Sequence, residues 1–323
     1  MADSSPRALV RTMSCLTIST QNPAALCDLL GNSMGWTLRS AGPITPAMAQ
    51  AWGVGGLESA HFALYGSEGS DRGMIRVIPG EDRFPSRQIG ARWSGAEIVV
   101  MEDIDGLYET LVARPDFTAD IEPDDADFSD VGANVHRFFY GRPSCGTHIM
   151  YTAEVTECRD YEFPRAPAPV GYIFSIPLVT TEFARVSAVL RDVLGMVPTL
   201  EDKLDGGIWH KTWKLDEGTP VDLAVIKGDA EGFGEGSIEL QGYPERVVDV
   251  VPFNADRFDG GSCLGTYVAT DFDAAYERLK DEPSIEGCTA PVVIDPAPYS
   301  GGRSFTIILP GGARLEIVER FDG

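Results

Sequence analysis

Apolar residues recur along the chain in two spacings that follow one another in a fixed order. Short runs in which apolar and polar residues alternate are followed by a polar turn, and then by a stretch with apolar residues three or four positions apart. Phe183, Val186 and Leu190 form such a stripe, which is the spacing of an amphipathic helix. Asp103 and Asp271 precede two of these stretches, where a carboxylate can cap free backbone N–H groups. The pattern predicts strands that each lead into a helix packed on a sheet.

This order occurs four times. The predicted first strands are 13–20, 96–103, 172–180 and 264–271. Each unit also closes with a glycine and a short strand, at 73–79, 146–152, 236–242 and 312–320. The first and third units match in the placement of their middle strands, and the second and fourth share a tight turn before the last strand. A repeat of this kind indicates a duplicated architecture, so the sequence predicts an α+β protein of four βαβββ modules.

A proline-rich stretch, FPRAPAP at 163–169, divides the four modules into two pairs. Such a stretch is a stiff spacer. We therefore expect an N-terminal two-module domain at 1–160, a linker at 161–169 and a C-terminal two-module domain at 170–323. One face of each sheet should pack under its helices while the other lines a hollow. Two modules side by side would make one cup, and each half of the chain would form its own cup.

Three segments carry a resemblance to a known family. They are RDVLGM (191–196), DFDAAYERL (271–279) and LPGGARLEIVER (309–320). Together with the fourfold repeat, they resemble the vicinal oxygen chelate superfamily, which includes glyoxalase I, extradiol dioxygenases, methylmalonyl-CoA epimerase and bleomycin-type resistance proteins. The resemblance covers nearly the whole chain and implies two cupped half-barrels. Because one fold hosts several chemistries, the reaction has to be argued from the site residues.

The resemblance also implies where a metal would bind. Metal-using members bring a His, Gln or Glu from a first strand and a Glu from a last strand to one divalent cation. The last-strand positions are Arg76, Met150, Glu239 and Glu316, and the first-strand positions are Ser14 or Cys15, Ala96 or Glu97, Phe174 or Ser175, and Leu264 or Gly265. None is a histidine, and a guanidinium stays cationic. Glu97 is the one plausible first-strand ligand, and it would face Met150 or Arg76. We expect no cofactor, with a divalent metal held by a rearranged ligand set as the alternative.

Two carboxylates remain at matching positions in the C-terminal half. Glu239 and Glu316 are expected to face one another inside one cup, where their pKa values would be pushed apart to give an acid and a base. The competing interpretation is that one of them pairs with an arginine such as Arg314 or Arg303. The predicted substrate contacts in this cup are Tyr172, Trp209, Asp222 and Tyr267.

The N-terminal half contains three of the four histidines. Alternation along the strands places His61 and His148 on the same face as Met150. With His136, they are the acid–base or ligand candidates of the N-terminal cup, and structural roles are the alternative. Arg76 and Met150 are predicted substrate contacts, with Arg76 or a tyrosine holding a developing oxyanion.

Charge narrows the range of partners. Lys plus Arg number 26 and Asp plus Glu number 49, a net charge of −23, which disfavours nucleic acids and anionic lipid surfaces. No apolar run approaches the roughly 20 residues of a membrane span. The N-terminal segment lacks the apolar core of a signal peptide. A cytoplasmic protein is expected, as a monomer or homodimer.

These observations leave three functional hypotheses. The leading one is an enzyme that acts without a metal on a small oxygenated molecule, of an aromatic or polyketide-like kind, by proton transfer, isomerisation or lyase-type elimination. The second is a non-catalytic binding protein similar to the resistance proteins. The third is an extradiol-like dioxygenase with a rearranged metal site.

Overall fold

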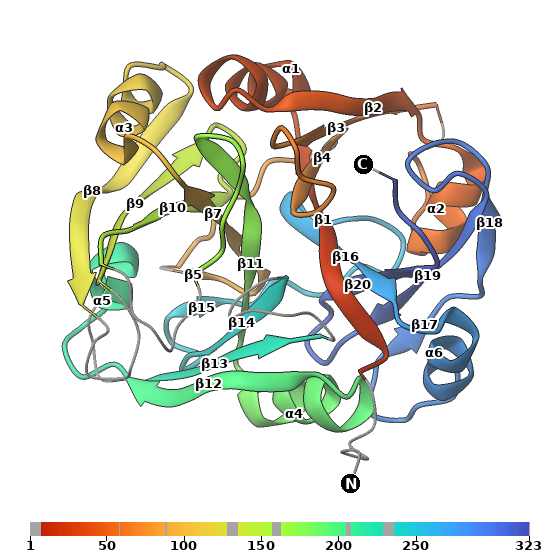
Figure 1. Ribbon diagram of the computed structural model, residues 1–323. Coiled ribbons are helices and arrows are strands. Elements are labelled where there is room, and N and C mark those ends of the chain that lie inside the picture. The colour runs from red at the N-terminus through yellow and green to blue at the C-terminus, as the bar shows by residue number, and fades with distance from the viewer. Residues whose placement is uncertain are drawn as a thin grey trace, which may run out of the picture.

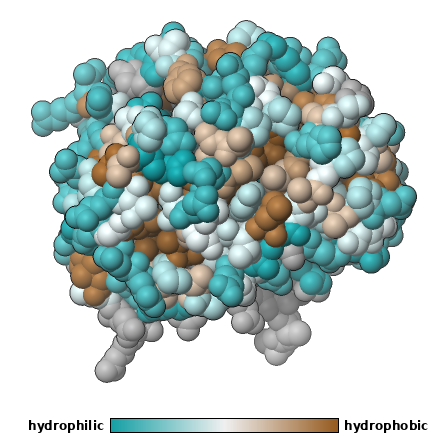
Figure 2. Space-filling view, turned by 90° about the horizontal axis from the view of Figure 1, so that it is seen from above, coloured by the Kyte–Doolittle hydropathy of each residue, from teal (hydrophilic) through white to brown (hydrophobic). Residues whose placement is uncertain are grey.

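The computed structural model describes residues 8–57, 59–87, 89–127, 135–156, 163–204, 208–228 and 236–322, except for the side chains of Ile208 and Trp209. Among these residues no helix is long and apolar enough to cross a membrane. The five described cysteines are free thiols, and Cys158 lies outside the described residues. Hydrophilic residues cover much of the face seen in Figure 2, with apolar residues interspersed.

The odd-numbered modules share one element order. Module one contains β1 (Val10–Thr20), α1 (Pro23–Asp28), η1 (Leu29–Ser33), β2 (Thr37–Pro43), α2 (Pro46–Trp52), β3 (His61–Gly66) and β4 (Met74–Pro79). Module three contains β11 (Val170–Thr180), α4 (Phe183–Ala188), η3 (Val189–Val193), β12 (Val197–Leu204), α5 (Ile208–Trp213), β13 (Val221–Lys227) and β14 (Ser237–Gly242). In both, the first helix ends in a π-helical turn, and an additional short helix separates the second and third strands. The last residue of this helix is a tryptophan in both modules, Trp52 in module one and Trp213 in module three.

The described residues of the even-numbered modules contain no such additional helix. Module two contains β7 (Gly95–Val100), α3 (Ile104–Val112), β8 (Phe117–Asp127), β9 (Val135–Pro143) and β10 (His148–Glu154). Module four contains β16 (Gly261–Ala269), α6 (Phe272–Leu279), β17 (Gly287–Cys288), β18 (Val292–Ile294), β19 (Gly302–Ile308) and β20 (Arg314–Val318). The short strands β5 (Ile89–Gly90), β6 (Arg92–Trp93) and β15 (Val248–Asp249) lie between modules. The four-module prediction is confirmed, including the alternation of two module types. Asp103 and Asp271 cap α3 and α6 as predicted.

Strand pairing joins the modules differently from the expectation. One sheet runs β17-β19-β20-β16-β1-β4-β3-β2 and combines modules four and one. The other runs β12-β13-β14-β11-β7-β10-β9-β8 and combines modules three and two. In each sheet the first strands of two modules pair antiparallel, β1 with β16 and β7 with β11. Figure 1 shows β1 beside β16 although the two strands lie at opposite ends of the chain.

The expectation that each half of the chain forms its own cup is therefore wrong. The three connections, 80–94, 155–169 and 243–260, are similar in length, so connection length does not favour one pairing of modules over another. The backbone hydrogen bonds between first strands decide it instead. The boundaries 1–160, 161–169 and 170–323 remain a prediction. Within the linker, Phe163 packs with Val99 and Phe174, so this part of the linker is packed against the sheet.

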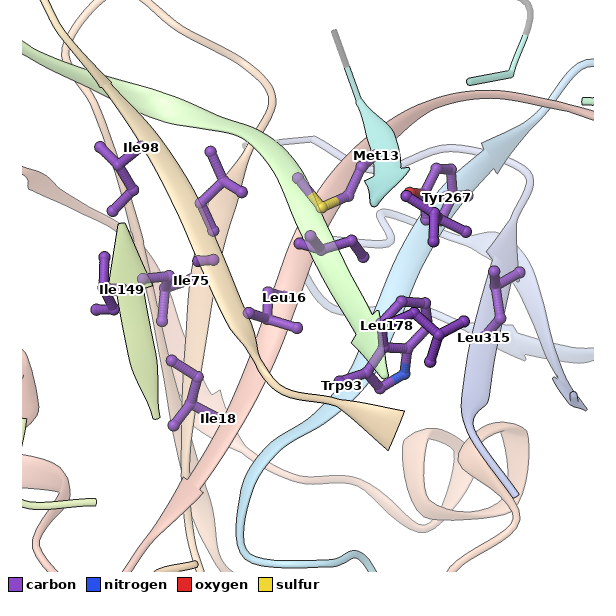
Figure 3. Close-up of a cluster of buried hydrophobic side chains, with 14 of the residues drawn as sticks. Met13, Leu16, Ile18, Ile75, Trp93, Ile98, Ile149, Leu178, Tyr267 and Leu315 are labelled. Atoms are coloured by element: carbon purple, nitrogen blue, oxygen red, sulfur yellow. The ribbon is translucent and has the colours of Figure 1, made fainter. Parts of the chain in front are cut away.

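The two sheets share one apolar core. Met13, Leu16 and Ile75 from one sheet and Ile98 and Ile149 from the other are buried in it (Figure 3). Leu26, Ile104, Val186 and Phe272 add one side chain from each of the four long helical segments. Because side chains alternate along a strand, the residues between these positions lie on the opposite face, which lines the cup of each sheet. We call this face of the two sheets the one–four cup and the two–three cup, after the modules that form each.

Candidate functional site

A buried ion pair occupies the one–four cup. Arg76 lies on β4 and Glu316 on β20, the last strands of modules one and four. The Arg76 Nη2 to Glu316 Oε2 distance is 2.8 Å, and both side chains are 0% exposed. The Arg76 guanidinium also lies 4.6 Å from the ring of Trp52, a residue of α2. The two last-strand positions therefore face one another, but they hold opposite charges.

Further hydrogen bonds complete this ion pair. Arg76 donates to Thr17 Oγ1 at 2.9 Å and Thr266 Oγ1 at 3.0 Å, and also to the Tyr299 hydroxyl. Glu316 accepts from Trp52 Nε1 (2.9 Å), Thr266 Oγ1 (2.7 Å), Tyr299 (2.7 Å) and Ser304 Oγ (2.8 Å). Burial alone would raise the pKa of Glu316, but the Arg76 charge and these donors hold it below its usual value. A buried charge pair persists only when it is satisfied in this way.

The surrounding side chains make this cup part of the core. Trp52, Phe62, Leu64, Tyr299 and Phe321 pack together around the ion pair. Four hydrogen bonds of the Arg76 guanidinium are made inside the cup, which does not fit the predicted role of Arg76 at a substrate oxyanion. The predicted arginine partners of Glu316 are also wrong, because Arg314 donates to the Asn254 and Ala255 carbonyls and Arg303 pairs with Asp273 and Glu319.

The two–three cup contains a pair of carboxyl groups instead. Glu97 lies on β7 and Glu239 on β14, with 4% and 8% exposure, and their carboxyl groups are hydrogen-bonded to each other. Gln241 Nε2 donates to Glu239 Oε1. The Tyr243 hydroxyl donates to Gln241 Oε1 at 2.9 Å. A connected polar row therefore runs from Tyr243 through Gln241 and Glu239 to Glu97.

Contact between the two buried carboxyl groups affects the ionisation of Glu97. Burial raises the pKa of Glu97 well above its usual value, and the charge of Glu239 and the hydrogen bond between the two groups raise it further. Burial, followed by the charges of this pair, also raises the pKa of Tyr140. The protonated form of Glu97 is therefore favoured in this cup, and it can donate the hydrogen bond to Glu239. This arrangement supplies a general acid and a general base at one point.

Aromatic side chains form the walls around this pair. Phe138, Tyr140 and Met150 cluster on β9 and β10. Trp213, the last residue of α5, lies 6.3 Å from the Tyr140 ring and 4.4 Å from the His148 ring, centroid to centroid. Trp213 thus occupies in module three the place that Trp52 occupies in module one. Apolar walls with a few polar groups at the base are typical of small-molecule sites.

The raised pKa of Glu97 predicts that stability falls as pH rises. Because the pKa of Glu97 is higher in the folded than in the unfolded chain, the folded state binds the extra proton above pH 4.5, the usual glutamate value. Its free energy of unfolding should therefore contain a contribution that falls as pH rises, by at most about 1.4 kcal/mol per pH unit for one proton. Urea denaturation at a series of pH values should show this slope, and Glu97→Gln should remove it. An unchanged slope in Glu97→Gln would contradict a raised pKa of Glu97. The exposed Glu102→Gln is the matched control.

The histidines do not assemble into one site. His148 lies on the same face of β10 as Met150, as predicted, with Nδ1 3.2 Å from Asp120 Oδ2, and burial lowers its pKa. Burial lowers the pKa of His136 to about 4. His61 is exposed at the start of β3, in the other sheet. The predicted grouping of His61 with His148 is therefore wrong, because the two residues belong to different cups.

The remaining predicted substrate contacts do not gather in one cup. Tyr172 is buried, and its hydroxyl donates to the Arg165 carbonyl at 3.2 Å. Tyr267 lies in the core between the sheets (Figure 3), not in a cup. Asp222 is half-exposed beside Lys203. The side chain of Trp209 lies outside the described residues. Glu239 and Glu316 do not face one another, because they belong to different sheets.

Sequence reasoning missed Gln241, Tyr243, Tyr140 and Trp213. A signal was present for the first two. Glu239, Gln241 and Tyr243 are two residues apart, so strand alternation places them on one side. Glu97 is the one ligand-like first-strand residue, and Met150 lies beside it in register across β7 and β10 as expected. Its hydrogen-bonded partner, however, is Glu239. That partner depended on which modules share a sheet.

Solved structures with the same architecture cover nearly all of the chain. Glyoxalase I from Zea mays aligns at 14% identity with a TM-score of 0.61, over 95% of this chain and 92% of that one. A putative dioxygenase from Bacillus subtilis aligns at 14% identity and a TM-score of 0.59, over 96% and 86%. No protein-family model and no curated protein sequence matches the chain. The chain has the vicinal oxygen chelate fold. At this level of identity, the likeness establishes the fold and not the reaction.

The vicinal oxygen chelate fold raises the question of a metal in either cup. In the one–four cup, the Arg76 guanidinium lies against Glu316, so a cation does not fit there. The two–three cup offers Glu97, Glu239 and the Gln241 amide. No group of three His, Cys, Asp or Glu side chains in the described part of the chain is arranged to hold a metal ion. The resemblance implies a ligand from the first strand and another from the last strand of the modules. Glu97 fills only the first-strand position of module two, and Glu239 fills only the last-strand position of module three. The proposed mechanism therefore uses no metal.

Proposed function

We propose that the protein is an enzyme that moves a proton on a small oxygenated molecule in the two–three cup. The observation that carries the proposal is the Glu97–Glu239 pair, buried and hydrogen-bonded. A carboxylate in such a place is a base, and its protonated neighbour is an acid. The fold is compatible with enzymes of the glyoxalase and dioxygenase kind. The proposed reaction itself is argued from the Glu97–Glu239 pair and the side chains around it.

The proposed mechanism uses each member of the polar row. The ionised carboxylate of the pair removes a proton from a carbon next to a carbonyl group. With an α-hydroxyketone, the protonated partner returns a proton to the former carbonyl carbon while the hydroxyl proton passes to the other oxygen, which gives isomerisation. With a leaving group on the next carbon, it protonates the leaving oxygen, which gives elimination. Gln241 holds Glu239 in position by donating to it, and Tyr243 fixes the orientation of the Gln241 amide. A low-dielectric surrounding strengthens these interactions.

The walls favour a planar or aromatic substrate. Phe138, Tyr140, Met150 and Trp213 are apolar surfaces next to a polar base. We therefore propose an aromatic or polyketide-like metabolite with adjacent oxygens as the substrate class. A non-catalytic binding protein would use the same walls, and the experiment below separates the two functions.

Hydrogen–deuterium exchange tests the proposal without a known product. We expect the protein to catalyse incorporation of solvent deuterium next to the carbonyl of α-hydroxyketones, or of aryl alkyl 1,2-diketones that carry a hydrogen on the alkyl carbon, in D2O, followed by NMR. General acid–base catalysis contributes about 10²–10⁴-fold. Binding of these compounds without exchange would favour sequestration. Near one equivalent of a tightly bound transition metal in the purified protein would favour a dioxygenase.

A further inference from the structure

A separate pocket lies where the two sheets meet. Its wall comes from the segments around Arg83 and Trp93, from 146–148 and from 261–262, together with Trp213 of α5, and it is partly open to solvent. The hydroxyl-bearing residues Ser94, Thr147 and Ser262 belong to this wall. Neither carboxyl group of the Glu97–Glu239 pair lines it.

A buried guanidinium in this wall has no partner. Nε, Nη1 and Nη2 of Arg83 are all buried, and none makes a hydrogen bond in the described part of the chain. Asp249 and Asp259 are the acidic groups whose charges act on Arg83, and the positive Arg92 is also nearby. Both carboxylates already have partners: Asp249 accepts from Ser86 N and Oγ, and Asp259 accepts from Arg92 at 2.5 Å.

The surroundings fix Arg83 in this position. Its backbone N–H donates to the Cys145 carbonyl at 3.1 Å. A Cβ added to Gly90 would lie 3.4 Å from Arg83 Cζ, and one added to Gly261 would lie 3.3 Å from Arg83 Cβ. At Gly146, a Cβ would lie 2.0 Å from the Arg83 carbonyl oxygen. Glycines at these three positions leave room for the arginine, so it is held from several sides.

A buried cation with unused donors indicates an absent anionic partner. A guanidinium presents five N–H donors in a planar fork that matches the oxygens of a carboxylate or a phosphate. Leaving such a group buried and unpaired costs several kcal/mol. The Ser262 hydroxyl donates to Thr147 Oγ1 at 3.4 Å, and hydroxyl groups of this kind can also bind oxyanion oxygens.

We propose that this pocket binds a small oxyanion, a carboxylate or a phosphate group, through Arg83. The site is independent of proton transfer in the two–three cup, although Trp213 and His148 border both places. An oxyanion here would pair with the free guanidinium and would lie beside the Trp93 and Trp213 rings.

Anion titrations at constant ionic strength test the proposal. The probes are inorganic phosphate and sodium acetate, each exchanged against chloride. We expect one or both to raise the melting temperature of the wild-type protein by about 2–4 °C near saturation, with a saturable change in tryptophan fluorescence. Arg83→Met should abolish both effects and should melt at a higher temperature than the wild type in chloride alone. The exposed Arg278→Gln should respond as the wild type does.

The two probes separate the sources of the oxyanion. A response to acetate alone identifies a carboxylate site, and a response to phosphate alone identifies a phosphate site. Equal behaviour of phosphate, acetate and chloride in the wild type would overturn the proposal, and so would an undiminished response in Arg83→Met. If that variant does not fold, the wild-type fluorescence titration alone decides the outcome.

Discussion

Replacement of Glu316 by Gln is expected to destabilise the protein by about 3–5 kcal/mol, because it removes one partner of a fully buried ion pair. The carboxamide keeps the shape of the side chain, but it leaves the Arg76 charge buried without a counter-ion. Such a loss is a large share of the 5–15 kcal/mol that stabilises an ordinary domain. Urea denaturation at pH 7 measures it.

Two further variants distinguish charge from packing. Glu319→Gln lies three residues further along the chain and removes a partly exposed ion pair with Arg303, so it should cost no more than about 1 kcal/mol. The double variant Arg76→Met/Glu316→Gln removes both charges and should be more stable than Glu316→Gln alone. A single variant as stable as the wild type would mean that the one–four cup is not held by this pair.

Replacement of Glu97 or Glu239 by Gln is expected to reduce activity without reducing stability. Exchange or turnover in the two–three cup should fall by about 10²–10⁴-fold, since each variant removes one half of the acid–base pair. Neither variant should lose stability at neutral pH. Glu97→Gln should gain stability, because a buried neutral amide avoids the cost of burying a carboxyl group that ionises in the unfolded chain. Catalytic groups that lower stability are a known source of such trade-offs.

The matched control is Glu102→Gln, which is exposed beyond β7. Exchange rates, binding of the test compounds and denaturation are measured on the same preparations. Full activity in both glutamate variants would remove the carboxyl pair from the mechanism. Loss of binding together with activity would instead point to a role of the pair in holding the ligand.

The interior of the two–three cup illustrates how far local patterns extend. Alternation along β14 places Glu239, Gln241 and Tyr243 on one side, and alternation along β10 places His148 with Met150. These relations depend on a spacing of two residues, which a strand imposes wherever it is located. They could be predicted from the sequence. Trp213 could not, because a short helix with one tryptophan carries no information on which cup it covers.

Four modules of two alternating types could be predicted from the sequence alone, and so could the last-strand positions Arg76, Met150, Glu239 and Glu316. These features follow from periodicity, which is local along the chain. The modules that share a sheet became known only from the strand pairing. That choice turned an expected Glu239–Glu316 pair into an Arg76–Glu316 ion pair and a Glu97–Glu239 acid pair. Connections of similar length permit several arrangements, and the hydrogen bonds between first strands select one of them.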